Sequence, residues 1–297
     1  MALPTVPTLT SIVTEALRKA SYTNIPTLVQ TRAETEWMDE IKSAIMNDVN
    51  KNSRKLKQLF KTAYTVTTIG IHRYSNPSDY SSDLNLVLLT GTNTGTAQAG
   101  AASSITLAST EDVTSAFAIG KYILITSGTG IYSSSQISAY NATTKVVTVS
   151  PDFSVSPALG DGYMIVDRVR DLVEKDVTKF DLLTLTTKSE PLNYHPIGSP
   201  TYGEFILYPT PDVVYGLRMR YYVDLLRVDL SSTLMSTLYE KWRVMWVQGI
   251  YMKALQNIDD PSAAKETKMF YDYILPSFLD KEAHGVEWND LQFIVNL

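Results

Sequence analysis

The sequence predicts an α+β protein: a helical bundle core with a small antiparallel sheet, plus an inserted all-β domain built as a sandwich or barrel. Apolar residues recur at helical spacing near both ends of the chain, and β-rich segments lie between them. The composition changes to Ser, Thr, Gly, Ala and Val over residues 85–167. We therefore expect residues 1–84 and 168–282 to form the core, residues 85–167 to form the inserted β-domain, and residues 283–297 to form an extended tail.

The composition indicates a folded protein without cysteine chemistry. The 297 residues are 44% hydrophobic, which is enough for a sizeable core in one large or two ordinary domains. With no cysteine, disulfides, cysteine-ligated zinc and thiol nucleophiles are excluded. The net charge of -5 argues against a surface that grips nucleic-acid phosphates. No signal-peptide pattern and no apolar run of about 18 residues is present, so we expect synthesis in a cytoplasm and no membrane span.

The broadest apolar stripe covers residues 232–257, which we predict to be one helix of about seven turns. Its second half is apolar nearly all round, so neighbours must cover most of it. Two interpretations remain open. The stripe packs inside the subunit's own helical bundle, or one flank is completed by another subunit through Trp242, Trp246 and Tyr251.

Further helices are predicted on both sides of this stripe. Residues 8–20 carry a one-sided stripe that Thr8 or Thr10 can cap. Residues 27–62 form a longer helix that bends or frays at residues 47–53. The basic residues near its end fit either the helix macrodipole or an acidic partner: Arg54, Lys55, Lys57 and Lys61. Residues 262–280 form the last helix, capped by Asp260 and kinked or ended by Pro276. Its inward residues are expected to be Phe270, Tyr273, Ile274 and Phe278.

Short strands are predicted between the helices. A first strand covers residues 64–71. Inside the β-domain we expect strands at residues 104–108, 122–127, 131–140, 146–150 and 163–166, with residues 93–102 as a flexible linker. Two more strands, residues 204–208 and 217–222, follow a loop of residues 191–202. In the second, Leu217, Met219 and Tyr221 face one side and Arg218 and Arg220 face the other.

No catalytic motif emerges from the chain. The three histidines, His72, His195 and His284, lie in separate regions. Gly128 and Gly130 lack the third glycine of a dinucleotide fingerprint and are interpreted as a hairpin turn. The carboxylates Asp171, Glu174 and Asp176 are interpreted as a solvated face. We therefore expect no enzyme activity, no cofactor and no metal.

The order of elements resembles the head-to-tail adaptor (connector) proteins of short-tailed bacteriophages. It runs from a short and a long helix through a sheet to an aromatic helix and a final helix. The most specific piece is Tyr208-Pro209-Thr210-Pro211-Asp212, followed by the Leu-x-Met-x-Tyr-Tyr strand of residues 217–222. The resemblance covers residues 1–75 and 175–282. The inserted residues 85–167 depart from the minimal adaptor, and their Gly-x-Gly turn is similar to small β-modules of phage structural proteins.

The resemblance implies a structural virion protein in the neck or tail, assembled in the host cytoplasm. Such subunits form a homo-oligomeric ring, twelve-membered in the family, that joins the portal protein to the tail nozzle. Tail-fibre proteins would be further neighbours, and genomic DNA would pass through without specific binding. The family's C-terminal segment reaches the portal. Here that implies a docking tail with these anchors: Trp288, Leu291, Phe293, Ile294 and Leu297. From its residues alone, the tail could equally fold back onto its own subunit.

Two other functions compete with the adaptor. In the first, residues 85–167 are a carbohydrate- or receptor-binding module of a tail, with Tyr122, Tyr132 and Tyr140 stacking on sugars. In the second, the chain is a cell-wall hydrolase whose carboxylates come together only in the fold. No sequence feature favours the hydrolase.

Overall fold

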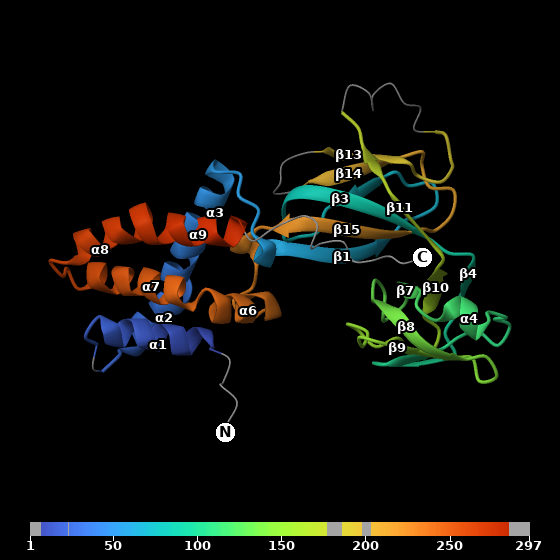
Figure 1. The fold of residues 1–297 in the computed structure, drawn as a ribbon, viewed down its shortest axis with the longest axis horizontal. Helices are drawn as coiled ribbons and strands as arrows, with labels where there is room; N and C mark the ends of the chain where they lie inside the picture. Colours follow the sequence, from blue (N-terminus) through green and yellow to red (C-terminus); the bar gives the residue numbers. More distant parts are fainter. Residues whose placement is uncertain (1–6, 23, 177–185, 198–202, 285–297) are drawn as a thin grey trace. The chain divides into compact units, whose positions relative to one another are not determined.

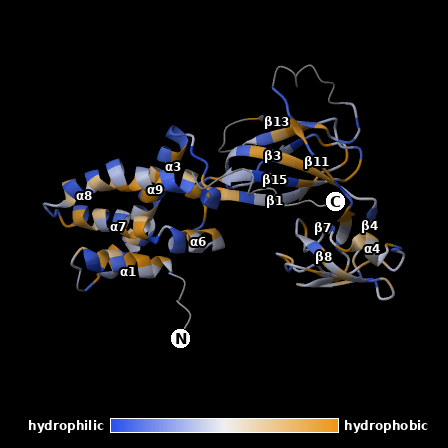
Figure 2. Ribbon diagram, viewed as in Figure 1, coloured by the Kyte–Doolittle hydropathy of each residue, from blue (hydrophilic) through white to orange (hydrophobic). Residues whose placement is uncertain are grey.

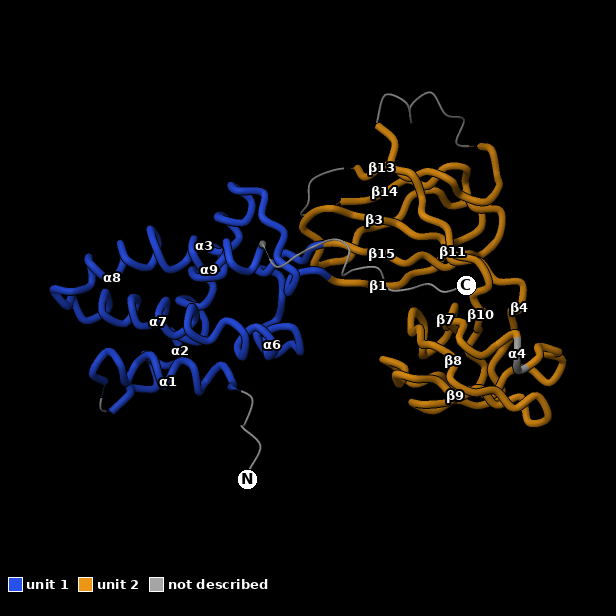
Figure 3. The backbone as a smooth tube through the Cα atoms, viewed as in Figure 1, with its two compact units in different colours: residues 1–60, 222–297 blue, residues 61–221 orange. Residues whose placement is uncertain are grey.

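The chain divides into two compact units in the computed structural model, which describes residues 7–22, 24–176, 186–197 and 203–284. Unit 1 comprises Met1–Phe60 and Tyr222–Leu297, and unit 2 comprises Lys61–Tyr221 (Figure 3). Unit 1 is helical and unit 2 is built mainly from strands (Figure 1). The predicted α+β class is confirmed. None of the described helices is long and apolar enough to cross a membrane.

The N-terminal helices of unit 1 follow the predicted pattern at their start. Helix α1 (Leu9–Lys19) begins at Thr8, whose hydroxyl accepts a hydrogen bond from the Ser11 amide in a capping box. A second helical run comprises α2 (Thr27–Arg32), a π-helical turn (Ala33–Trp37) and α3 (Met38–Lys51). Figure 2 shows both hydrophobic and hydrophilic residues along these helices. The hydrophobic ones include the buried Ile12 and Leu17 of α1.

The second helical run is shorter than predicted. It ends at Lys51, and Ser53 adopts the left-handed backbone conformation at φ 50°. The poor helix formers at residues 50–53 therefore end the helix and do not merely bend it. The macrodipole interpretation of the basic cluster is wrong, because that cluster lies beyond the helix. Instead, Arg54 forms ion pairs with Asp48 and Asp280.

The long aromatic stripe forms two helices and not one. Helix α6 (Thr233–Lys241) begins at Ser232, whose hydroxyl accepts from the Met235 amide at 3.2 Å. Helix α7 (Arg243–Asn257) follows after Trp242, whose φ of -106° and ψ of 19° depart from helical values. The backbone bond from the Trp242 amide to the Leu238 carbonyl is kept at 2.8 Å. The prediction of one helix is therefore wrong only at this single-residue break.

The last helical run differs from the prediction in its inward face. It comprises α8 (Ala263–Met269), a π-helical turn (Phe270–Ile274) and α9 (Leu275–His284). Tyr273 was expected inside but is 65% exposed, whereas Leu275 and Leu279 are buried. A π-helical turn holds an extra residue and so shifts the phase of the stripe. This turn ends one residue before Leu275-Pro276, and Pro276 lies within α9 without ending the helix.

Unit 2 contains two four-stranded sheets whose orders are β1-β15-β3-β11 and β12-β13-β14-β2. The first is made of β1 (Phe60–Val66), β15 (Gly216–Val223), β3 (Tyr80–Thr90) and β11 (Arg168–Asp171). The second is made of β12 (Val173–Glu174), β13 (Asn193–Ile197), β14 (Glu204–Tyr208) and β2 (Arg73–Ser75). The Tyr194 hydroxyl of β13 donates to the Leu84 carbonyl of β3 at 2.5 Å and links the sheets.

The predicted alternation in β15 is confirmed. Leu217, Met219 and Tyr221 are buried, while Arg218 and Arg220 are half-buried. Two predictions fail nearby. The first strand covers Phe60–Val66 and not residues 64–71, and β13, which carries His195, lies within the segment predicted to be a loop. β13 is paired on both sides, with β12 and with β14, and this pairing gives a Pro-containing segment its strand structure.

The remaining strands of unit 2 form one seven-stranded sheet in the order β4-β10-β7-β8-β9-β6-β5. They are β4 (Asn93–Thr96), β10 (Gly162–Val166), β7 (Tyr122–Ser127), β8 (Ser134–Asn141), β9 (Val146–Val149), β6 (Ser104–Thr106) and β5 (Ala99–Ala101). All five predicted strands are present, β7 with the predicted bounds and the other four with shifted ends. The predicted linker is wrong, because residues 93–102 supply both edge strands. A short helix, α4 (Ser115–Ala118), was not predicted.

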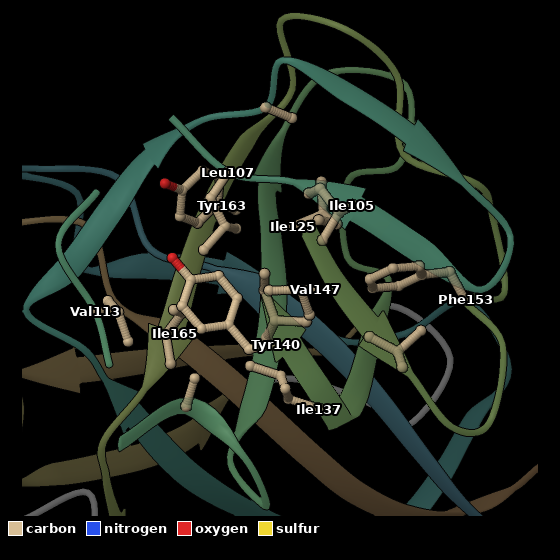
Figure 4. Close-up of a cluster of buried hydrophobic side chains, with 14 residues drawn as sticks. Ile105, Leu107, Val113, Ile125, Ile137, Tyr140, Val147, Phe153, Tyr163 and Ile165 are labelled. Atoms are coloured by element: carbon tan, nitrogen blue, oxygen red, sulfur yellow. The ribbon is translucent and has the colours of Figure 1, made fainter. Parts of the chain in front are cut away.

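This sheet curls without closing into a barrel. Its two edge strands, β4 and β5, are separated in the chain by only Ala97 and Gln98, so the ends of the sheet are brought near one another. The sheet encloses a hydrophobic cluster of its own, in which Figure 4 shows Tyr140, Tyr163 and Phe153. β3 runs across residue 85, where the sequence had indicated a domain boundary.

Candidate functional site

The predicted docking tail cannot be assigned a geometry. Its anchors, Trp288, Leu291, Phe293, Ile294 and Leu297, lie outside the described residues. Their role in portal docking stays a prediction.

Trp242 and Trp246 are core residues of unit 1. Both are fully buried within the single chain. The Trp242 ring meets Phe278 edge-on at 5.8 Å between centroids and lies 6.3 Å from the Trp246 ring. The Trp246 indole N–H donates to the Leu238 carbonyl at 3.2 Å. These two side chains therefore have no surface to offer to another subunit, and packing within the bundle is the interpretation that fits them.

Tyr251 is half-buried and belongs to a polar network that joins three helices. The Lys19 ammonium of α1 lies 4.5 Å from the centre of the Tyr251 ring, a cation–π distance. The same Lys19 Nζ donates to Gln248 Oε1 at 2.6 Å, and Gln248 Nε2 donates to Glu266 at 2.9 Å. Burial raises the pKa of Tyr251, and the nearby Glu266 raises it further. This network connects α1, α7 and α8 and so holds together segments from both ends of the chain.

Exposed apolar side chains of unit 1 lie elsewhere. Val244 is 76% exposed on α7, and Leu28, Met269 and Tyr273 are exposed on other helical segments. A hollow of about 540 Å³ lies along α8 and is bordered by the end of α7 and the π-helical turn. It is lined by Gln256, Ala263, Ala264, Thr267, Lys268, Tyr271 and Asp272. These are the surfaces of unit 1 that a partner could contact.

The tyrosines proposed for sugar stacking do not form one platform. Tyr140 is buried in the core of the curled sheet. Tyr122 and Tyr132 are exposed but lie at different points along the length of β7. Tyr122 is the first residue of that strand and pairs with Gln136. The Tyr132 amide donates to the carbonyl of Ile125, three residues further along. A common sugar-binding face of these three side chains is therefore not formed.

The residues considered for chemistry remain dispersed. His72 lies between strands, His195 Nδ1 lies 2.8 Å from the Lys175 carbonyl, and His284 ends α9. Within the part of the chain that the structure describes, no three His, Asp or Glu side chains are grouped to hold a metal. Glu174 accepts a hydrogen bond from the Tyr194 hydroxyl at 3.3 Å.

A buried carboxylate, Asp161, explains the Gly-x-Gly turn. Its oxygens accept hydrogen bonds from the amides of Thr129, Gly130 and Ala158 at 2.8–3.0 Å. Burial alone would raise the pKa of Asp161, but these three bonds together lower it below its ordinary value. Gly128 has φ 90°, and an added Cβ there would overlap the Asp161 carboxylate. Asp161 is thus a structural acceptor for turn amides.

A second buried carboxylate, Glu111, lies beside a polar hollow that the sequence did not reveal. Glu111 is 8% exposed and accepts from Asn93 Nδ2 at 3.1 Å and from the Tyr163 hydroxyl at 3.0 Å. The Tyr163 hydroxyl also accepts from the Ala108 amide at 3.0 Å. Burial and the bond to Glu111 raise the pKa of Tyr163, so it stays a neutral donor. An added Cβ at Gly95 would lie 2.5 Å from this hydroxyl, which explains the glycine in β4.

The hollow has a volume of about 370 Å³. It is lined by Thr92, Asn93, Thr94, Gly95, Thr96, Gln98, Ala108, Thr110 and Glu111. Interpreting residues 93–102 as a linker concealed it. The only available signal was the Thr-x-Thr alternation of β4, and that pattern is too common to indicate a site.

A scan against protein-family models finds no match, and a search of curated proteins finds none either.

Proposed function

We propose that this chain is a head-to-tail adaptor of a short-tailed bacteriophage, a structural ring subunit between the portal and the tail nozzle. The observation that carries the proposal is the assembly of unit 1 from both ends of the chain. Helix α1 packs against α7, and α3 packs against both α7 and α9. The sheets are inserted between these helical segments. This is the arrangement of helix pair, sheet and closing helix pair that the resemblance implies.

The Tyr-Pro-x-Pro-Asp segment supports the proposal locally. It connects β14 of one sheet to β15 of the other. The Tyr215 hydroxyl donates to Asp212 at 2.7 Å, and the Gly70 amide donates to the Pro211 carbonyl at 2.9 Å. The segment therefore fixes the path between the two sheets, which gives a structural reason for the most specific part of the resemblance.

Ring formation requires contact surfaces outside the subunit core. The buried Trp242 and Trp246 cannot provide them. We assign this role to exposed apolar side chains of unit 1, including Leu28, Val244 and Tyr273. The net charge of -5 suits a channel wall past which DNA slides without specific binding.

Affinity capture from the source lysate tests the proposal. The tagged full-length chain is compared with a version that ends at Ala283, and captured proteins are identified by mass spectrometry. We expect the full-length chain to capture a portal protein and the shortened chain to lose it, because the proposed anchors lie in residues 284–297. Equal capture by both versions would keep the adaptor and move its docking surface to the helices. Capture of no portal or tail protein by either version would contradict the proposal.

A further inference from the structure

The curled sheet of unit 2 holds a hollow in which some of the polar groups are not used by the fold. The side-chain hydroxyls of Thr94, Thr96 and Thr110 form no hydrogen bond with any residue of the described chain. Thr94 and Thr96 are exposed on β4, an edge strand that pairs only with β10 in the seven-stranded sheet. The hollow therefore presents free donors and acceptors along an open strand edge.

Glu111 gives this hollow a fixed acceptor. Each of its oxygens already accepts one hydrogen bond, from Asn93 or from Tyr163. A carboxylate has about four acceptor positions, so further positions remain for a donor in the hollow. Because two bonds hold the carboxylate in place, a ligand would meet an acceptor that needs no reorganisation. Because Glu111 is only 8% exposed, folding has already removed most of the water around its carboxylate, and ligand binding has little more to remove.

The lining discriminates between classes of ligand. It contains no Lys, Arg or His, and Glu111 repels anions. Its side chains are mostly hydroxyl, amide and carboxylate groups, which disfavours an apolar ligand. A divalent cation would need several oxygen ligands with more charge than one carboxylate provides. A neutral ligand rich in hydroxyl groups remains, because its hydroxyls can donate to Glu111 and both donate to and accept from threonines.

We propose that this hollow is a binding site for a neutral saccharide, recognised by Glu111, Asn93, Thr94, Thr96 and Thr110. The volume of about 370 Å³ lies near the lower end of small-molecule pockets, which span about 300–1,000 Å³. The site differs from the three tyrosines considered from the sequence, since Tyr163 acts here only as a donor that positions Glu111. Saccharide binding goes beyond the adaptor role and gives the inserted strands a recognition function of their own.

Saturation-transfer NMR with the full-length chain tests the site. The probes are a panel of neutral hexoses, N-acetylhexosamines and their oligosaccharides, with uronic acids and sialic acid as charged comparisons, all in the presence of a chelator. We expect at least one neutral sugar to bind and the charged sugars not to bind. Glu111→Gln removes the charge and should weaken binding about tenfold or more, because hydrogen bonds to a charged acceptor are the stronger kind.

Two threonine variants make a matched pair for the same assay. Thr94→Val removes a hydroxyl from the hollow and should weaken binding roughly two- to tenfold. Thr148→Val makes the same change at an exposed position of β9, outside the hollow, and should leave affinity unchanged. Amide spectra of each variant verify that the sheet is folded. The proposal is overturned if no neutral sugar binds, if only charged sugars bind, or if binding survives both Glu111→Gln and Thr94→Val.

Discussion

Unit 1 and the curled sheet of unit 2 differ in how their buried backbone polar groups find hydrogen-bond partners. The helices of unit 1 satisfy most of their backbone groups internally, and apolar side chains such as Trp242 and Trp246 dominate their core. The curled sheet has short strands and many turns, whose amides lack strand partners. Asp161 accepts from such turn amides, and Glu111 accepts from the side chains of a tyrosine and an asparagine. The helical core therefore depends mainly on apolar packing, whereas the small curled sheet depends on buried carboxylates as well.

The three tryptophans among the described residues, Trp37, Trp242 and Trp246, lie in unit 1, and residues 61–221 contain no tryptophan. Tryptophan fluorescence therefore reports the unfolding of unit 1, and backbone amide NMR reports both units. This separation allows each variant to be assigned to one region.

The largest effect is expected from Trp246→Ala. The substitution leaves a cavity in a fully buried cluster and should cost about 3–5 kcal/mol of unfolding free energy. Urea unfolding followed by tryptophan fluorescence measures it, with the remaining tryptophans as reporters. Val244→Ala is the control on the same helix, and because Val244 is 76% exposed it should cost less than about 0.5 kcal/mol. Equal costs for the two variants would contradict the buried position of Trp246.

Asp161→Asn should have the next largest effect, and it should act on unit 2. The amide side chain cannot accept from three backbone amides as the carboxylate does, so we expect a cost of roughly 3 kcal/mol. Amide exchange of Thr129 and Gly130 measures it. Unchanged protection of these amides would show that the carboxylate is dispensable.

The same residue predicts a pH dependence. Its folded pKa is lower than its ordinary value of 3.8, so its stabilising contribution is fully present above that value. It is lost as the pH falls through the lower folded pKa. Wild-type unit 2 should therefore lose stability in this acidic range, and Asp161→Asn should lose less. Parallel acid titrations of both proteins, followed by amide NMR, provide the test.

The glycine turns offer a smaller, matched comparison. Gly128 and Gly120 both have positive φ, 90° and 88°. An added Cβ overlaps the Asp161 carboxylate at Gly128, but meets nothing within 4 Å at Gly120. Gly120→Ala should cost about 1 kcal/mol from backbone strain alone. Gly128→Ala should cost about 2 kcal/mol more. If thermal unfolding gave equal costs, the contact between the turn and Asp161 would be refuted.

The smallest effect is expected at the surface of unit 1. Arg243 Nη2 and Glu15 Oε2 lie 2.6 Å apart, but both side chains are about half exposed. Glu15→Gln should therefore change the stability by only about 0.2–1 kcal/mol. Tryptophan fluorescence in urea, at low and high salt, measures this difference. A loss of more than about 1 kcal/mol would show that this ion pair contributes more to the stability of unit 1 than an exposed ion pair usually does.

The sequence predicted unit 1 better than the curled sheet for a physical reason. Helical periodicity is local, so α1 and most of α7 follow directly from their apolar spacing. The errors occurred where one residue changes the phase, at Trp242 and at the π-helical turn before Pro276. In unit 2, β7 and β14 were predicted correctly. The edge strand β4 was missed because its partner, β10, lies far away in the chain, and β5 was missed although it pairs with the neighbouring β6. The Glu111 hollow depends on three such long-range contacts and leaves no local pattern.

The adaptor role is the central claim of this account, and its most direct test is electron microscopy of the complex captured by the full-length tagged chain. We predict a closed ring of copies, coaxial with the channel at one end of a portal ring. The contacts between neighbouring copies should involve the exposed apolar side chains of unit 1. Isolated copies bound to the side of a particle, or no ring on any captured partner, would contradict the adaptor role.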